Sequence, residues 1–280
     1  MTKVVSSPTS TSNEIFGHGL RVSTETTLRP GIILSPSVPD IALDDLAKGC
    51  EDFADYSTCV LMKEIITFTL RVEEAEPGKA LTVKTWNSLW VFSLLSLACS
   101  TPCMSLFTKN DAKFAVSNRN RFIRPLADIA DATQAQLDWA ITYFDHFDSL
   151  VADESFSRAV RYLTNSHYLF DIDARIMLLW AGIECLLGVE SELRNRIALH
   201  AAIMLDAEPA EKHAYLKTVR SAYDVRSKVV HGRAKSAADL QAGYEQAASV
   251  LTRLLRKCVE LGRVPSAGEL DAAASKAALI

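Results

Sequence analysis

The strongest constraint on the fold is a helical hydrophobic pattern that occupies nearly all of the second half of the chain. It predicts helices over residues 133–150, 155–168, 172–187, 190–205, 211–230 and 237–261. Gly188, Asp206 and Gly232 separate consecutive segments, and Pro209 stands just ahead of the fifth. Helices joined by short connections pack as antiparallel neighbours because each has to bury one apolar face. We therefore expect an antiparallel helical bundle over residues 131–263.

The first half has a mixed pattern. Residues 14–35 alternate between apolar and polar side chains and contain several glycines and a proline, which predicts two or three short strands. Residues 41–71 have helical periodicity, although residues 60–72 fit a strand equally well, and residues 82–99 predict an apolar helix. Residues 113–125 are short and polar, which predicts a hairpin or a loop.

The fold class that follows is mainly α, with a C-terminal helical bundle preceded by a smaller mixed α/β region. We place the mixed region at residues 13–130 and the bundle at residues 131–263. The Ser/Thr-rich residues 1–12 predict a disordered tail, and residues 264–280 are expected to form a second tail.

Residues 85–108 contain no Asp, Glu, Lys or Arg over 24 positions, which is long enough to span a membrane. Five serines, Asn87 and Pro102 favour instead a buried core helix that is broken near Pro102. None of the six cysteines forms a Cys-x-x-Cys pair, and the first residues lack the apolar stretch of a signal peptide. We therefore expect a cytoplasmic protein with reduced thiols, no membrane association and no metal or other cofactor.

Charge is distributed unevenly along the chain. The whole protein has a net charge of −4, whereas residues 211–263 contain eleven Lys and Arg against five Asp and Glu, a local charge of +6. A basic segment on an otherwise acidic protein suits a ligand that carries phosphate. A solvated helix surface with an uneven charge distribution explains the same numbers, and composition does not decide between the two.

Within the basic segment, residues 223–232 read Tyr-Asp-Val-Arg-Ser-Lys-Val-Val-His-Gly and place Arg226 five positions before His231. Arginine presents a planar fork that matches phosphate oxygens, and histidine exchanges a proton near neutral pH. At about 100° per residue, Arg226 falls in the middle of the apolar arc of its helix. A charge on that face needs a partner, and Glu184 is the only acid in residues 176–187, so we predict that the two side chains are in contact.

This pair has two interpretations. Either Arg226 and Glu184 hold two helices together without a catalytic role, or Arg226 opens into a cleft where a phosphate replaces the carboxylate. His231 lies about 140° from Arg226 on a straight helix, so the two side chains do not meet unless the helix ends near His231 or a second chain brings a histidine to the arginine. Gly232 could end the helix and let His231 turn back, or two chains could each contribute half of a composite site.

These segments resemble a known family. The Arg226-x(4)-His231 spacing and the string at residues 223–232 are similar to the HEPN superfamily, in particular its Apea-like branch. Residues 175–188 and 193–205 resemble the two preceding helices of that branch. The resemblance covers the predicted bundle and none of the mixed region before it.

The resemblance implies a metal-independent endoribonuclease, in which the 2′-OH of RNA attacks the adjacent phosphorus. Arg226 and His231 would be catalytic, the first by stabilising charge on the phosphoryl oxygens and the second by transferring a proton. The residues implied to support them are Ser227, Tyr223 and Glu184, and those implied to contact the substrate are Lys228 and Arg233. Toxin-like or antiviral roles are common in the superfamily, as are dimers built around the Arg/His motif. RNA and a second copy of the chain are therefore the expected partners.

A non-catalytic alternative remains open. Many members of the superfamily are understood to bind RNA or a nucleotide, or to mediate protein–protein contacts as dimers, without cleaving. A polar amide or acid often follows the motif arginine, and Ser227 in that place favours this alternative. In a third interpretation, residues 13–130 sense a ligand or a protein and control the bundle.

Overall fold

The computed structural model describes residues 3–118, 120, 125–126, 128–189, 191, 193–205, 209–231 and 236–277, without the side chains of residues 209 and 210. The chain divides into two compact units, Met1–Phe144 and Asp145–Ile280. The sequence places the division near residue 130. It lies later because helix α5 (Gln134–Thr142) buries its apolar face against helix α4 (Val91–Cys99) and the sheet of the first unit.

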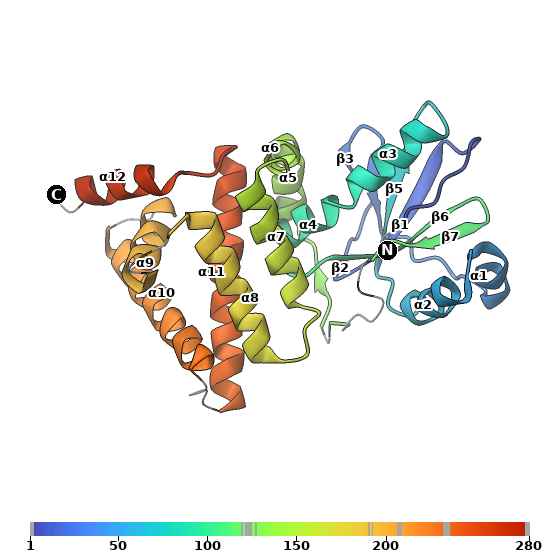
Figure 1. The fold of residues 1–280 in the computed structure, drawn as a ribbon. Coiled ribbons are helices and arrows are strands. Elements are labelled where there is room, and N and C mark those ends of the chain that lie inside the picture. Colours follow the sequence, from blue (N-terminus) through green and yellow to red (C-terminus); the bar gives the residue numbers. More distant parts are fainter. Residues whose placement is uncertain are drawn as a thin grey trace. The chain divides into compact units, whose positions relative to one another are not determined.

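The first unit is built around an antiparallel sheet (Figure 1). Its strands are β1 (Ser12–His18), β3 (Thr26–Arg29), β4 (Ile32–Ser35), β5 (Phe68–Glu73), β6 (Met104–Asn110) and β7 (Lys113–Val116). Their order is β3-β4-β5-β1-β6-β7, and every neighbouring pair is antiparallel. On β1, Ile15 is opposite Leu70 of β5 and Thr108 of β6, and all three side chains are buried. The short strands β2 (Leu20–Arg21) and β8 (Ala130–Asp131) pair in parallel.

Helices cover the sheet. They are α1 (Leu43–Gly49), α2 (Phe53–Lys63), α3 (Lys79–Ser88), α4 and α5. Figure 1 shows α1 and α2 near β6 and β7, whereas α3 contacts β1 and β5. Phe16, Leu46, Met62 and Phe107 belong to the core between the sheet and α1–α2, where the Phe16 and Phe107 rings meet edge to face with centroids 4.9 Å apart. Burial of these apolar side chains is the main force that holds the helices on the sheet.

Two predictions for the first unit are corrected by the structure. The segment predicted to hold two or three strands, residues 14–35, belongs to four. The helix predicted over residues 41–71 is divided into α1 and α2 and stops at Lys63, and residues 68–73 form β5. The strand interpretation of that last stretch holds because β5 pairs with β1 and β4, partners that a local pattern does not contain.

The uncharged run of residues 85–108 is broken near Pro102, as predicted, but the helix predicted over residues 82–99 is two helices. The run comprises the end of α3, all of α4 and the start of β6. The chain turns at Ser100, which has a φ of 52°, and the Cys103 N–H donates a 2.8 Å hydrogen bond to Ser96 Oγ that closes the turn. No helix among the described residues is long and apolar enough to cross a membrane.

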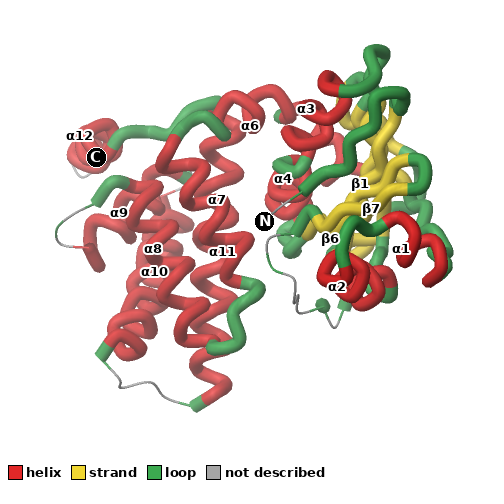
Figure 2. Tube along the Cα trace, turned by 45° about the vertical axis from the view of Figure 1, so that its right-hand side comes forward, coloured by secondary structure: helices red, strands yellow, loops and turns green. Residues whose placement is uncertain are grey.

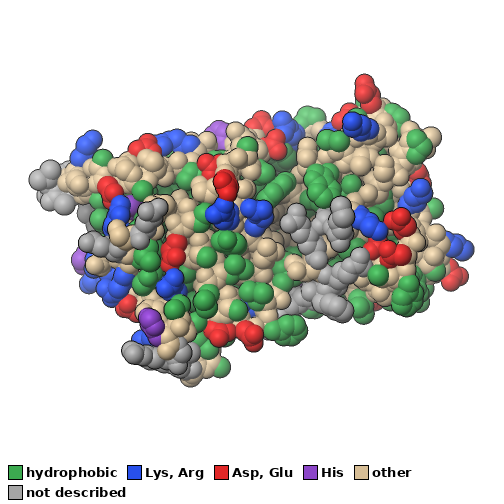
Figure 3. Space-filling view, viewed as in Figure 1, with side chains coloured by type: hydrophobic (Ala, Val, Ile, Leu, Met, Phe, Trp, Pro, Cys, Tyr) green, Lys and Arg blue, Asp and Glu red, His purple; other side chains and the backbone are tan. Residues whose placement is uncertain are grey.

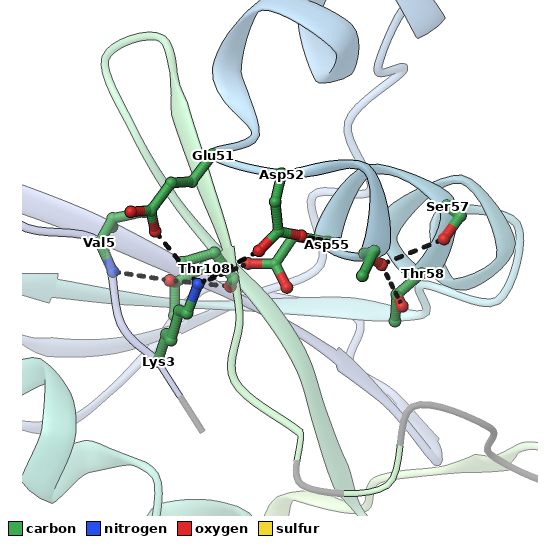
Figure 4. A network of polar contacts seen from close by, with 10 residues as sticks. Lys3, Val5, Glu51, Asp52, Asp55, Ser57, Thr58 and Thr108 are labelled. Atoms are coloured by element: carbon green, nitrogen blue, oxygen red, sulfur yellow. Dashed lines mark hydrogen bonds and ion pairs between the residues drawn. The ribbon is translucent and has the colours of Figure 1, made fainter. Parts of the chain in front are cut away.

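Residues 3–11 pack onto the rest of the first unit, whereas the sequence predicts a disordered tail there. Val5 is 3% exposed, and its N–H donates a 3.0 Å hydrogen bond to Thr108 Oγ1. Lys3 Nζ lies 3.1 Å from Glu51 and 3.5 Å from Asp55, whose side chain is buried (Figure 4). A buried carboxylate needs a nearby positive charge, and Lys3 supplies it. These partners are far away in the sequence, so the polar composition of the segment gives no sign of them.

The second unit is helical throughout its described residues (Figure 2). Its helices are α6 (Phe144–Leu150), α7 (Glu154–Ser166), α8 (Ile172–Leu187), α9 (Leu193–Met204), α10 (Pro209–Val230), α11 (Ala237–Leu261) and α12 (Ala267–Ala277). α8 contacts α7, α9, α10 and α11, and its Trp180 is fully buried. Gly188 and Gly262 end α8 and α11 in the left-handed conformation, with φ of 60° and 66°. The predicted fold class, mainly α with a mixed region before a helical bundle, is confirmed.

The bounds of α8 and α11 coincide with the predicted helices, and two other predictions for this part need correction. The helix predicted over residues 133–150 is interrupted at Tyr143, so α5 and α6 are separate. The tail predicted over residues 264–280 contains α12. Ser266 and Glu269 cap its start through reciprocal side-chain and backbone hydrogen bonds, and α12 packs against α9, which explains why a helix forms there.

Candidate functional site

The predicted contact between Arg226 and Glu184 is confirmed. Arg226 Nη2 on α10 lies 3.1 Å from Glu184 Oε1 on α8, and the two side chains are 25% and 23% exposed. Glu184 Oε1 is itself shielded from solvent and accepts no aligned hydrogen bond from a described residue. The contact is therefore an ion pair without hydrogen-bond geometry. The guanidinium keeps its donors available for another acceptor.

Aromatic side chains fix the position of this guanidinium. Arg226 Cζ lies 5.4 Å from the centroid of the Tyr223 ring, one turn earlier on α10. Tyr223 meets Trp180 of α8 edge to face, with ring centroids 5.2 Å apart and an interplanar angle of 86°. Such contacts contribute on the order of 1 kcal/mol each. The two rings therefore hold Arg226 on the side of α10 that faces α8.

His231 lies elsewhere on the helix surface. Its backbone N–H donates a 3.2 Å hydrogen bond to the carbonyl of Ser227, which continues the helical pattern one residue beyond α10. Five helical steps separate its side chain from that of Arg226 by about 140°. The imidazole is exposed and has no hydrogen bond, ion pair or ring contact with a described residue. The turn proposed at Gly232 lies outside the described residues, as does Arg233.

Lys228 lines a groove on a third side of α10. The groove lies between α10 and α11, has a volume of about 310 Å³, and is also lined by Asp224 and Asp239. Lys228 and Arg226 are about 160° apart on the helix. Within one chain the groove and the Arg226 guanidinium therefore lie on different sides of α10.

Of the predicted site residues, the structure groups Tyr223, Arg226 and Glu184. Ser227 is half-buried, and its hydroxyl forms no hydrogen bond with a described residue. His231 and Lys228 project from other sides of α10. A single chain therefore contains an arginine site with aromatic and acidic neighbours, and a histidine that is separate from it.

Further positive charge lies along α10, and sequence reasoning missed part of it. Arg220 is partly buried, its Nε has no acceptor, and no described carboxylate pairs with it. Arg253 of α11 has its Cζ 4.4 Å from the centroid of the Tyr215 ring, and burial raises the pKa of Tyr215 to about 12. A helical wheel could have identified Arg220, because it lies only about 60° from Tyr223 on α10.

Some of the other charges on this unit are paired with an opposite charge. Arg194 of α9 binds both carboxylate oxygens of Asp224 at 2.6 and 2.8 Å, and this contact lowers the pKa of the Asp224 carboxyl. Figure 3 shows Lys and Arg side chains over α9 and α10 with Asp and Glu among them. On the face that Figure 3 shows, the positive charges are therefore interspersed with negative ones.

No family model, no curated protein and no solved structure matches this chain. Within the described part of the chain, no cluster of three or more His, Cys, Asp or Glu side chains is arranged to hold a metal ion.

Proposed function

We propose that the helical unit is a HEPN-type module that cleaves RNA without a metal ion. The observation that carries the proposal is the environment of Arg226: a quarter-exposed guanidinium, positioned by Tyr223 and paired with Glu184 without a hydrogen bond. A phosphodiester oxygen can replace that carboxylate and gain the aligned hydrogen bonds that Glu184 does not accept.

The proposed reaction uses the RNA itself as the nucleophile. The 2′-OH loses its proton and forms a bond to the adjacent phosphorus, and the bond from phosphorus to the 5′-oxygen breaks. The products are a 2′,3′-cyclic phosphate and a 5′-OH. His231 takes the proton from the 2′-OH and returns it to the departing 5′-oxygen, and Arg226 stabilises the charge that develops on the phosphoryl oxygens. DNA lacks the 2′-OH and should resist cleavage.

The separation of Arg226 and His231 leads us to propose a homodimer. Because the two side chains diverge by about 140° on one helix, a shared site needs a histidine from a second copy of the chain. Val230 lies one turn beyond Arg226 on the same face of α10 and is 43% exposed. An exposed apolar side chain in this place is suited to an interface between two copies.

A second candidate is a module that binds RNA or a nucleotide, or dimerises to mediate protein–protein contacts, without cleaving. The specific observation in its favour is Arg220, a partly buried cation without a described partner on the same helix. Binding to a phosphate would satisfy it without a proton-transfer group.

One experiment separates the two candidates. The purified chain is incubated with total RNA in EDTA beside the Arg226→Ala and His231→Ala variants, with His213→Ala as a matched control because His213 is also exposed on α10. We expect the parent and the control to produce 2′,3′-cyclic phosphate ends, and both site variants to lose cleavage while His231→Ala keeps its fold. If His231→Ala cleaves as fast as the parent, the catalytic assignment is wrong. RNA binding without cleavage by the parent would support the second candidate.

A further inference from the structure

A second arginine–histidine pair lies on α9, and in this pair the two side chains converge. Arg196 Nη2 lies 2.7 Å from Oδ2 of Asp271, and His200 Nε2 lies 2.7 Å from Oδ1 of the same carboxylate. Arg196 and His200 are one helical turn apart and therefore share a face of α9. Asp271 belongs to α12. Each of the two side chains donates a hydrogen bond to a different oxygen of one carboxylate, as side chains do in an anion-binding site.

The site is built into the protein rather than spread over its surface. His200 is fully buried, whereas Arg196 is 29% exposed and Asp271 is 46% exposed. Arg196 Nη1 also approaches Ser191 Oγ at 3.4 Å. Solvent therefore reaches the position of the anion, while the imidazole that binds it is held in the interior.

The second nitrogen of the imidazole is unusual. His200 Nδ1 is buried and has no hydrogen-bond partner among the described residues. A neutral ring that donates from Nε2 leaves the Nδ1 lone pair unsatisfied, and a protonated ring leaves an Nδ1–H unsatisfied. Either state carries a cost in free energy, because a buried polar atom is normally hydrogen-bonded. The Asp271 carboxylate thus satisfies only one of the two ring nitrogens, the one that faces the anion.

The helix that supplies the anion is attached by a small contact. α12 lies beside α9 (Figure 1), where Leu270 and Ala274 are its buried apolar side chains. The hydrogen bond from His200 and the contact with Arg196 lower the pKa of the Asp271 carboxyl, so it is an anion at neutral pH. A stronger anion competes directly with this carboxylate.

We propose that Arg196 and His200 form a phosphate-binding site that Asp271 occupies in the resting state, so that phosphate binding releases α12. A carboxylate brings one negative charge to this pair. A phosphate monoester brings up to two charges and more acceptor oxygens, and it can accept hydrogen bonds from the guanidinium and from the imidazole Nε2–H together. The inference concerns different residues from the proposed ribonuclease site and does not depend on it.

The test compares phosphate binding by the full chain and by Asp271→Ala, with calorimetry at constant ionic strength. Removal of the competing carboxylate should strengthen binding of inorganic phosphate by about ten-fold or more, because the site no longer has to be vacated before phosphate binds. Arg196→Gln added to this variant should abolish the gain. The matched control is Asp224→Ala, which frees Arg194, an exposed arginine without a histidine, and should produce no gain.

Dimethyl phosphate distinguishes the two sources of a phosphate group. A gain with inorganic phosphate alone supports a terminal phosphate monoester as the ligand, and a gain with both probes supports an internal phosphodiester. No gain with either probe overturns the proposal. If Asp271→Ala fails to fold, hydrogen exchange of the parent decides: phosphate, and not chloride, should accelerate exchange in residues 267–277. Unchanged exchange there then overturns the proposal.

Discussion

The ion pair between Arg226 and Glu184 supports a quantitative prediction about stability. Two unit charges about 4 Å apart at an effective dielectric of about 20 attract by about 4 kcal/mol, and desolvation and side-chain entropy offset much of this. Exposed pairs retain about 0.2–1 kcal/mol, whereas breaking a buried pair costs about 3–5 kcal/mol. The two side chains are 25% and 23% exposed. We therefore expect a coupling energy of about 1–2 kcal/mol, between these limits.

The measurement is a double-mutant cycle with Arg226→Ala, Glu184→Gln and the combined variant, each unfolded in urea and followed by circular dichroism. Arg226→Ala should cost about 2–3 kcal/mol, because it strands a carboxylate and removes the contact with Tyr223. Glu184→Gln should cost less, since the amide keeps the shape and loses the charge. The combined variant should cost less than the sum of the two by the coupling energy.

A cycle on Arg194 and Asp224 provides the control. That pair is bidentate but 47% and 43% exposed, so its coupling should be smaller than that of Arg226 and Glu184 despite the better hydrogen bonds. Additive effects of Arg226→Ala and Glu184→Gln within about 0.5 kcal/mol would show that burial does not strengthen this contact. A larger loss for Glu184→Gln than for Arg226→Ala would refute the reasoning about the stranded carboxylate.

Three further predictions concern other residues of the helical unit. Val230→Lys should lower the dimer fraction measured by light scattering, because the exposed side chain lies on the proposed interface; a parent protein that is monomeric and still cleaves RNA contradicts the composite site. Gly243→Ala should lower the urea midpoint, because the added Cβ would lie 2.6 Å from Val225 Cγ1. Such overpacking costs about 1–3 kcal/mol, whereas the change from Gly to Ala gains about 1 kcal/mol in helix propensity. Adding Val225→Ala to the Gly243→Ala variant should restore the urea midpoint. An unchanged midpoint in Gly243→Ala alone would show that α10 and α11 move apart there at little cost. The hydrogen bond from the backbone N–H of Ser266, with that from the Arg263 side chain, lowers the pKa of Glu269 to about 2. The ionised carboxylate therefore stabilises the fold fully above its unfolded pKa of about 4.3, and this stabilisation is lost as the pH falls toward 2. The difference in melting temperature between the parent and Glu269→Gln should shrink over that range, and a constant difference excludes a contribution from the charged form.

Local pattern was sufficient for much of the helical unit. The bounds of α8 and α11 follow from hydrophobic periodicity, with Gly188 as the predicted end of α8, and the structure adds that Gly262 ends α11 in the same left-handed conformation. The contact of Arg226 with Glu184 was also predictable. Each is a lone charge on an apolar helix face, and burying an unpaired charge costs so much free energy that an opposite charge is expected beside it.

Tertiary structure alone decided the remaining features, because they depend on partners far apart in the sequence. Residues 104–110 become a strand only because β1 and β7 lie on either side of them. His200 contacts Asp271, which is 71 positions away in the sequence. The pattern of α9 alone gives no information about which residue of α12 lies beside it. The sequence alone determined that Arg226 and His231 diverge on their helix, since a helix advances by about 100° per residue whatever surrounds it. Convergence of two side chains on one anion requires elements to be packed together, and packing is a property of the folded chain.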